Sequence, residues 1–138
     1  MGESVGNRSN RMRFLQDFRC NGRVSIWIGT VKPTPDQMQV DILKGMCGVE
    51  YYDLDSQETN GHSKWKPLPV KRLLKRISYS KSFLAEAVAA ATAKGIETGV
   101  WVVCQFDFDY DPALAKQPIA DDPVFIGSFP WQADDEEL

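Results

Sequence analysis

Three aspartates stand at alternate positions near the end of one apolar run. Asp107, Asp109 and Asp111 lie in FDFDYD. Because alternate side chains of a strand point the same way, these carboxylates can converge on a divalent cation, which prefers oxygen ligands. The spacing resembles the start of an EF-hand loop, but Pro112 and Pro118 stand where that loop needs Gly and Glu. A metal-dependent hydrolase using these aspartates is therefore an alternative function only, and we expect no metal and no cofactor.

The residues for nucleophilic catalysis do not form a recognisable set. Ser128 lies in GSF, which is not the Gly-x-Ser-x-Gly turn of serine hydrolases, and His62 is the single histidine of the sequence. The sequence also has no glycine-rich phosphate loop and no Cys-x-x-Cys pair. We therefore expect a protein that is not an enzyme.

Charge is distributed unevenly along the chain. The segment Lys64–Lys81 holds seven basic residues and no acidic one, whereas residues 100–138 hold nine acidic residues and one basic residue. With Trp65 and Tyr79 inside it, the basic segment could bind phosphates and stack bases, so a nucleic-acid-binding module is a second alternative. The formal net charge of −3 argues against it. We expect no nucleic-acid partner.

Aromatic residues accompany the carboxylates at the ends of two expected strands. Aromatic anchors beside charge are typical of protein interfaces, where they supply affinity and steered association. If the two strand ends lie side by side, they form one candidate surface for binding a protein. Its residues are Tyr51, Tyr52, Asp53, Asp55, Asp107, Asp109, Tyr110 and Asp111. The basic segment is the competing surface.

The elements that must position these residues follow from periodicity. The run VWVVCQFDFDY, residues 100–110, predicts a central strand that is apolar on both sides at its start, with Val100, Val102, Cys104, Phe106, Phe108 and Tyr110 on one face. Further strands are expected at 24–31, 48–55 and 124–129, and helices at 35–44, 67–77 and 83–94. The order predicts an α+β fold: a single mixed or antiparallel sheet of about four strands with helices mostly packed on one face.

Length and composition predict one domain. With 138 residues, 43% of them hydrophobic, the chain can bury a core of its own. We expect a flexible N-terminal extension over residues 1–22, a single α+β domain over 23–131 and an acidic C-terminal tail over 132–138. No run is long enough to span a membrane, the start lacks a secretory signal, and the three cysteines lack metal-ligand spacing. These features favour a cytoplasmic protein without a membrane partner.

Five segments occur in an order that is familiar from one protein family. They are VSIWIGTV, YYDLD, SFLAEAVAAATAKG, FDFDY and FIGSFPW. Over residues 24–131 the chain thereby resembles the immunity protein 22 family of bacterial polymorphic toxin systems. The resemblance implies a small cytoplasmic protein that binds and neutralises a cognate toxin, delivered by contact-dependent or type VI-like secretion, and so protects the producing bacterium. It carries over no contact residue. The acidic candidate surface suits a basic cleft, which favours a nuclease or a nucleotide-directed toxin.

Overall fold

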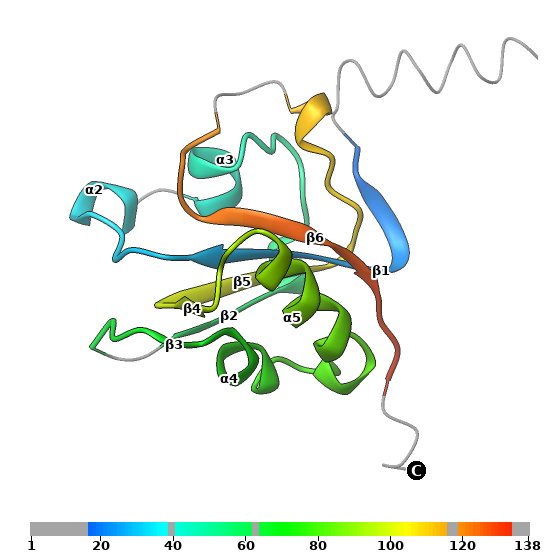
Figure 1. Ribbon diagram of the computed structural model, residues 1–138. Helices are drawn as coiled ribbons and strands as arrows, with labels where there is room; N and C mark the ends of the chain where they lie inside the picture. Colours follow the sequence, from blue (N-terminus) through cyan, green and yellow to red (C-terminus); the bar gives the residue numbers. More distant parts are fainter. Residues whose placement is uncertain (1–16, 39–40, 62–63, 116–118, 134–138) are drawn as a thin grey trace, which may run out of the picture.

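The computed structural model describes residues 17–38, 41–61, 64–115 and 119–133 (Figure 1). Its strands are β1 (Arg19–Gly29), β2 (Gln57–Gly61), β3 (Leu68–Pro69), β4 (Thr98–Gly99), β5 (Trp101–Phe108) and β6 (Val124–Pro130). Its α-helices are α2 (Pro35–Met38), α3 (Ile42–Met46), α4 (Val70–Lys75) and α5 (Leu84–Ala93). Three short 3₁₀ turns are η1 (Leu54–Ser56), η2 (Ser80–Ser82) and η3 (Pro112–Leu114). None of the helices in these ranges is long and apolar enough to cross a membrane.

The main sheet has four antiparallel strands in the order β2-β5-β1-β6. Strand β5 therefore lies inside the sheet, as its two apolar faces predict, and the α+β class with about four strands is confirmed. In the register of β1 and β5, Gly29 is opposite Trp101 and Ile26 is opposite Cys104. Strands β3 and β4 form a separate two-stranded sheet.

Each face of the sheet buries its own core. On one face, Val24, Ile26 and Ile28 of β1 pack with Val102 and Cys104 of β5 beneath α4 and α5 (Figure 1). The opposite face carries a second core, which includes Trp27, Leu43, Met46, Val49 and Val103 and is covered by α3 and the segment after it. The two longest helices thus share one face, and the alternation along β1 places its residues as the sequence predicts.

The first strand begins earlier than expected. Strand β1 starts at Arg19 rather than after Arg23, and Phe18 just before it is only 5% exposed. The ring of Phe18 packs edge-on against Phe108 and Tyr110, at centroid distances of 5.5 and 5.3 Å. A boundary at residue 22 is therefore wrong, because an aromatic anchor fixes the preceding segment to the core. Residues 1–16 and 134–138 of the expected extension and tail lie outside the described residues.

The expected helix over residues 35–44 is divided into α2 and α3. Asp41 has an extended backbone, and its side chain accepts a hydrogen bond from the backbone N–H of Lys44, so it starts a new helix as an N-cap. Gly45 follows the expected helix, and the sequence therefore predicts a left-handed helix stop at this glycine. Gly45 lies within α3, and Gly48, with φ of 72°, adopts the left-handed conformation instead.

The strand predicted over residues 48–55 is wrong. This segment is irregular up to Asp53, whose side chain caps η1 by accepting from the backbone N–H of Asp55 at 3.0 Å. The strand begins only at Gln57 and includes Asn60-Gly61, which the sequence predicts as a turn. Two polar side chains hold this segment of weak strand propensity in place. Asn60 donates to the carbonyl oxygen of Leu73, and Glu58 accepts from the backbone N–H of Ser78. Tertiary contacts thus override its weak strand propensity.

The remaining elements agree with the sequence within a few residues. In α4 and just after it, Leu73, Leu74 and Ile77 are buried as predicted. The sequence predicts Ser80 or Ser82 as the N-cap of the next helix. Helix α5 buries Ala87 and Ala91, but its N-cap is Phe83, and no side chain caps it. Strand β6 covers the predicted residues, and it pairs with β1. His62, expected on an exposed loop, lies outside the described residues.

Candidate partner-binding surfaces

The alternation along β5 breaks at Asp107. This residue adopts a left-handed backbone with φ of 55°, and between Arg19 and Val24 the register with β1 shifts. After the break, Phe108 and Tyr110 belong to the opposite core from Val102, Cys104 and Phe106. The sequence prediction that all of them share one face with Val100 is therefore wrong, and Val100, just before β5, also belongs to the core of Phe108. A bulge of this kind turns the strand and redirects every later side chain.

Two of the predicted surface residues are used inside the fold. The half-buried carboxylate of Asp107 accepts a hydrogen bond from the backbone N–H of Gly22 at 2.9 Å. Tyr110 is 4% exposed, and its hydroxyl donates to the carbonyl oxygen of Cys47 at 2.6 Å. Burial raises the pKa of this phenol to about 12. Neither side chain is available as a surface anchor.

Tyr52 is a third predicted residue that the fold withdraws in part from the surface. Its side chain is half-buried and packs against the core that contains Trp27. Burial raises the pKa of its phenol above the ordinary value, and a hydrogen bond with Asp41 raises it further. Both causes favour the neutral form, so Tyr52 serves as a neutral, packed residue.

The other five predicted residues are exposed: Tyr51, Asp53, Asp55, Asp109 and Asp111. They come from two segments that leave the same end of the sheet, because β2 begins where antiparallel β5 ends and Gln57 lies opposite Gln105. The side-chain amide of Gln105 donates to the carbonyl oxygen of Asp53 at 2.7 Å, which fixes the first segment against β5. The two acidic runs thus lie at the same end of the sheet, although only one of them follows a strand.

A shallow depression lies at this end of the sheet. It is lined by Asp17, Phe18, Arg19, Cys20, Asp109, Asp111 and Leu114. Arg19, one of the lining residues, also reaches the segment that contains Tyr51. Its guanidinium binds both carboxylate oxygens of Asp17, at 2.8 and 2.6 Å, and lies 5.4 Å from the ring centre of Tyr51. The contact with Asp17 raises the pKa of Arg19, so its charge is held in place. Arg19 thereby connects the depression to Tyr51.

Large apolar side chains stand among the carboxylates. Tyr51 is 47% exposed, Leu54 65% and Leu114 47%. Together with Asp53, Asp55, Asp109 and Asp111 they form what we call the acidic surface. Exposed Leu and Tyr side chains ringed by charge are typical of a protein-binding surface, because they can be desolvated while the charges remain at the rim. Leu54 and Leu114 were not predicted as site residues; each stands in a polar turn segment, DLDS and DPAL, which is the signal that could have identified them.

The geometry gives no support to a metal centre formed by the aspartates. Asp107 is engaged by Gly22, and Asp111 caps η3 by accepting from the backbone N–H of Ala113 at 3.0 Å. Within residues 17–38, 41–61, 64–115 and 119–133, no group of three or more His, Cys, Asp or Glu side chains is placed to hold a metal ion. No observation thus favours the hydrolase alternative.

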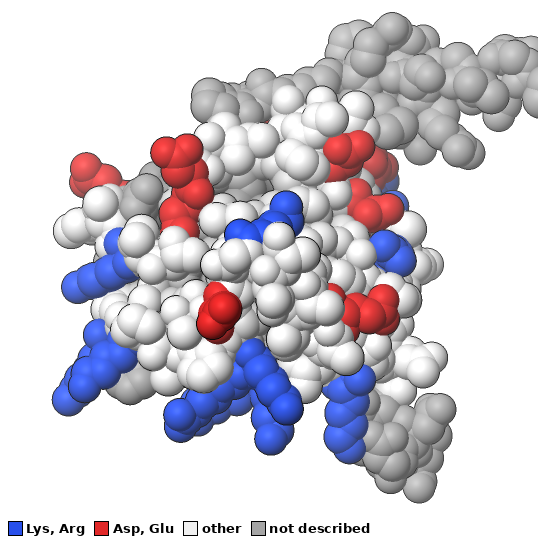
Figure 2. Space-filling model, viewed as in Figure 1, with Lys and Arg blue, Asp and Glu red and all other residues white. Residues whose placement is uncertain are grey.

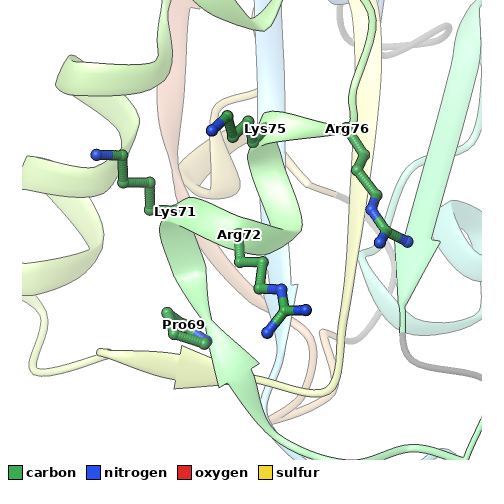
Figure 3. Close-up of a pocket in the computed structure, with 5 residues that line it drawn as sticks. All are labelled: Pro69, Lys71, Arg72, Lys75 and Arg76. Carbon is green, nitrogen blue, oxygen red and sulfur yellow. The ribbon is translucent and has the colours of Figure 1, made fainter.

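The competing basic segment forms a distinct surface on α4. Lys71, Arg72, Lys75 and Arg76 are exposed and surround an open depression beside Pro69 (Figure 3). We call these four residues the basic face. Figure 2 shows Lys and Arg side chains gathered along the lower edge of the molecule, where Figure 1 places α4. The charge asymmetry of the sequence therefore becomes an asymmetry of the folded surface.

The fold and these surfaces define an α+β protein with a four-stranded antiparallel sheet and two charged surfaces. No family model matches the chain, and no curated protein or solved structure matches it either.

Proposed function

We propose that this protein is an immunity protein, which binds and neutralises a cognate secreted toxin through the acidic surface. The observation that carries the proposal is the exposure of Tyr51, Leu54 and Leu114 among four carboxylates. An inhibitor needs a partner surface with apolar anchors for affinity and charge for rapid association. The acidic surface supplies both.

The charge of the surface indicates the kind of toxin. Enzymes that act on phosphates carry basic clefts, and a cluster of carboxylates on a rigid support can occupy such a cleft in place of the substrate. The carboxylates of the acidic surface stand on such a support, because Asp109 follows β5 and its backbone N–H donates to the carbonyl oxygen of Phe18 at 2.8 Å. A nuclease or a nucleotide-directed enzyme is therefore the favoured toxin class. The resemblance of five sequence segments to immunity protein 22 supports the same function.

The proposal predicts that a neighbouring gene encodes a secreted protein with a toxin domain, and the test uses that domain. Co-expression should restore growth of cells that produce the toxin, and association rates should be measured with the two purified proteins. We expect Asp109→Lys with Asp111→Lys to slow association at least about tenfold, or about 1.4 kcal/mol if dissociation is unchanged. Leu54→Ala should chiefly speed dissociation, since it removes an apolar anchor without changing charge.

The matched control reverses charge on the other surface. Lys71→Glu with Lys75→Glu changes the same number of charges on the basic face, and it should leave the association rate within about twofold. Slower association for this control alone would transfer the toxin site to α4. Failure of the protein to bind or neutralise the neighbouring toxin would refute the proposed function.

A further inference from the structure

The basic face combines four uncompensated cations on one short helix. Lys71, Arg72, Lys75 and Arg76 all lie within or directly after α4, whose six residues extend over roughly 9 Å at 1.5 Å per residue. In the part of the chain that the structure describes, no carboxylate forms an ion pair with any of the four. Crowding of like charge at i and i+4 is unfavourable by itself. An anionic ligand would relieve it.

The four side chains form two rows. Lys71 and Lys75 project to one side of α4, and Arg72 and Arg76 to the other (Figure 3). Residues four apart on a helix are neighbours along its axis, so each row presents two cations one turn apart. The depression that they line has a volume of about 440 Å³, which is the size of a small-ligand site. Because Lys and Arg side chains are long and flexible, those of both rows can turn towards an anion in the depression between them.

The composition of the basic face argues against a protein as its ligand. The apolar residues of α4, which are Val70, Leu73 and Leu74, are all buried in the core. The surface thus offers the stems and charges of Lys and Arg without an exposed apolar anchor, whereas protein interfaces depend on such anchors. The acidic surface has them, and the basic face does not. Two of the four cations are Arg, whose planar fork suits phosphate oxygens.

The dimensions argue against a nucleic-acid strand. Proteins that follow a strand combine an extended basic groove with aromatic platforms for the bases. Here the cations are confined to a turn and a half of helix, and the lining residues are Pro69 and the four cations, without an aromatic ring. Tyr79, the nearest exposed tyrosine in sequence, stacks on Trp131 at a centroid distance of 5.0 Å. A compact polyanion fits better than a polymer.

We propose that the basic face is a binding site for a compact ligand with two or three linked phosphate groups, such as a nucleoside triphosphate. Its Lys row and Arg row bind neighbouring phosphates. The inference does not rest on the proposed function, because the acidic surface contributes none of these residues.

The test measures binding of inorganic triphosphate by calorimetry in low salt, without metal ions. We expect one molecule per chain, an affinity that falls as salt increases, and much weaker binding of inorganic monophosphate. Arg72→Gln with Arg76→Gln should weaken triphosphate binding at least about tenfold, because it removes one row of charge-assisted contacts. Lys71→Gln with Lys75→Gln is the second variant, and it should weaken binding similarly; thermal unfolding checks the fold of both.

The control variant, Lys32→Gln with Lys44→Gln, removes two exposed cations outside the basic face and should bind triphosphate as tightly as the wild type. Adenosine triphosphate should bind at least as well as inorganic triphosphate. Absence of triphosphate binding would overturn the proposal, as would equal weakening by the control variant or equal affinity for monophosphate. Tighter binding of a single-stranded RNA or of polyglutamate than of triphosphate would assign the face to that polymer instead.

Discussion

The carboxylate of Asp107 accepts a hydrogen bond from the backbone N–H of Gly22 at 2.9 Å, and both residues have left-handed backbones, with φ of 55° and 83°. The contact joins two irregular points of neighbouring strands. It holds the left-handed residue of β5 against the extra residues of β1, where the register shifts between Arg19 and Val24. Asp107 is therefore a structural residue, although its position among the aspartates predicts a surface role.

Variants at Asp107 should separate the contribution of its side-chain acceptor from that of its left-handed backbone. Asp107→Ala removes the acceptor and places a less tolerant residue in the left-handed region, so we expect a loss of about 1–3 kcal/mol of unfolding free energy. Asp107→Asn keeps an oxygen acceptor and tolerates this conformation, so it should cost less than about 1 kcal/mol. Urea denaturation measures both. Equal stability of the alanine variant and the wild type would show that the Gly22 contact contributes nothing.

The packing of Trp101 leaves no room for a side chain at Gly29. A Cβ atom built at Gly29 would lie 1.9 Å from Nε1 of Trp101, and that indole donates to the carbonyl oxygen of Val31 at 3.1 Å. We expect Gly29→Ala to cost at least about 1–3 kcal/mol by overpacking, as measured by denaturation. In a Trp101→Phe background the same substitution should cost less, because the smaller ring leaves room. Strict additivity of the two substitutions would contradict the direct clash.

Replacing the buried thiol of Cys104 with a polar group should lower the stability of the fold. Cys104 is fully buried opposite Ile26 in the first core, and burial raises the pKa of its thiol. Cys104→Ser places a hydroxyl there, and we expect a loss of about 1–3 kcal/mol. The matched control is Cys20→Ser, an exposed cysteine whose replacement should change stability by less than about 0.5 kcal/mol. Similar effects at both sites would contradict the placement of the central strand.

Stability should decline at alkaline pH. Burial raises the pKa of the Cys47 thiol from 9.0 to about 12 and that of the Tyr110 phenol from 10.0 to about 12. The unfolded chain therefore releases these protons first, so the stabilisation is complete below pH 9 and is lost as pH rises towards 12. Denaturation at a series of pH values from 8 upward should show a falling unfolding free energy.

Tyr110→Phe supplies the control for that pH dependence. It removes one of the titrating groups and its hydrogen bond to Cys47, so it should lower stability at neutral pH by about 1–3 kcal/mol. It should also make the alkaline decline less steep, since fewer protons are released on unfolding. An unchanged slope would mean that the phenol of Tyr110 ionises equally in both states.

The elements with strong periodicity could be predicted from the sequence. The alternation of Val24, Ile26 and Ile28, and the doubly apolar start of β5, are consequences of burial that a sequence displays directly. Strand β2 could not be predicted, because its residues are polar and its strand conformation depends on β5 and on the side-chain contacts of Asn60 and Glu58. The strand propensity of this segment is weak, and its pairing with β5, which is distant in sequence, determines its conformation.

The candidate surface could be predicted in part for a similar reason. Asp109 and Asp111 are exposed because they follow a rigid central strand, which the sequence indicates. The burial of Tyr110 could not be predicted, since the bulge at Asp107 reverses the faces and is fixed by a contact with Gly22. Arg19 was missed because its connection of Asp17 to Tyr51 exists only in the folded chain.

The position of β1 in the sheet also governs the order of assembly during synthesis. Its two neighbours, β5 and β6, are the last described strands to leave the ribosome, while β1 is the first. The apolar residues of β1, such as Trp27, therefore remain unpaired with β5 and β6 until nearly the whole domain has been synthesised. Pairing between such distant segments makes folding slow. The nascent chain therefore exposes this apolar strand for most of its synthesis.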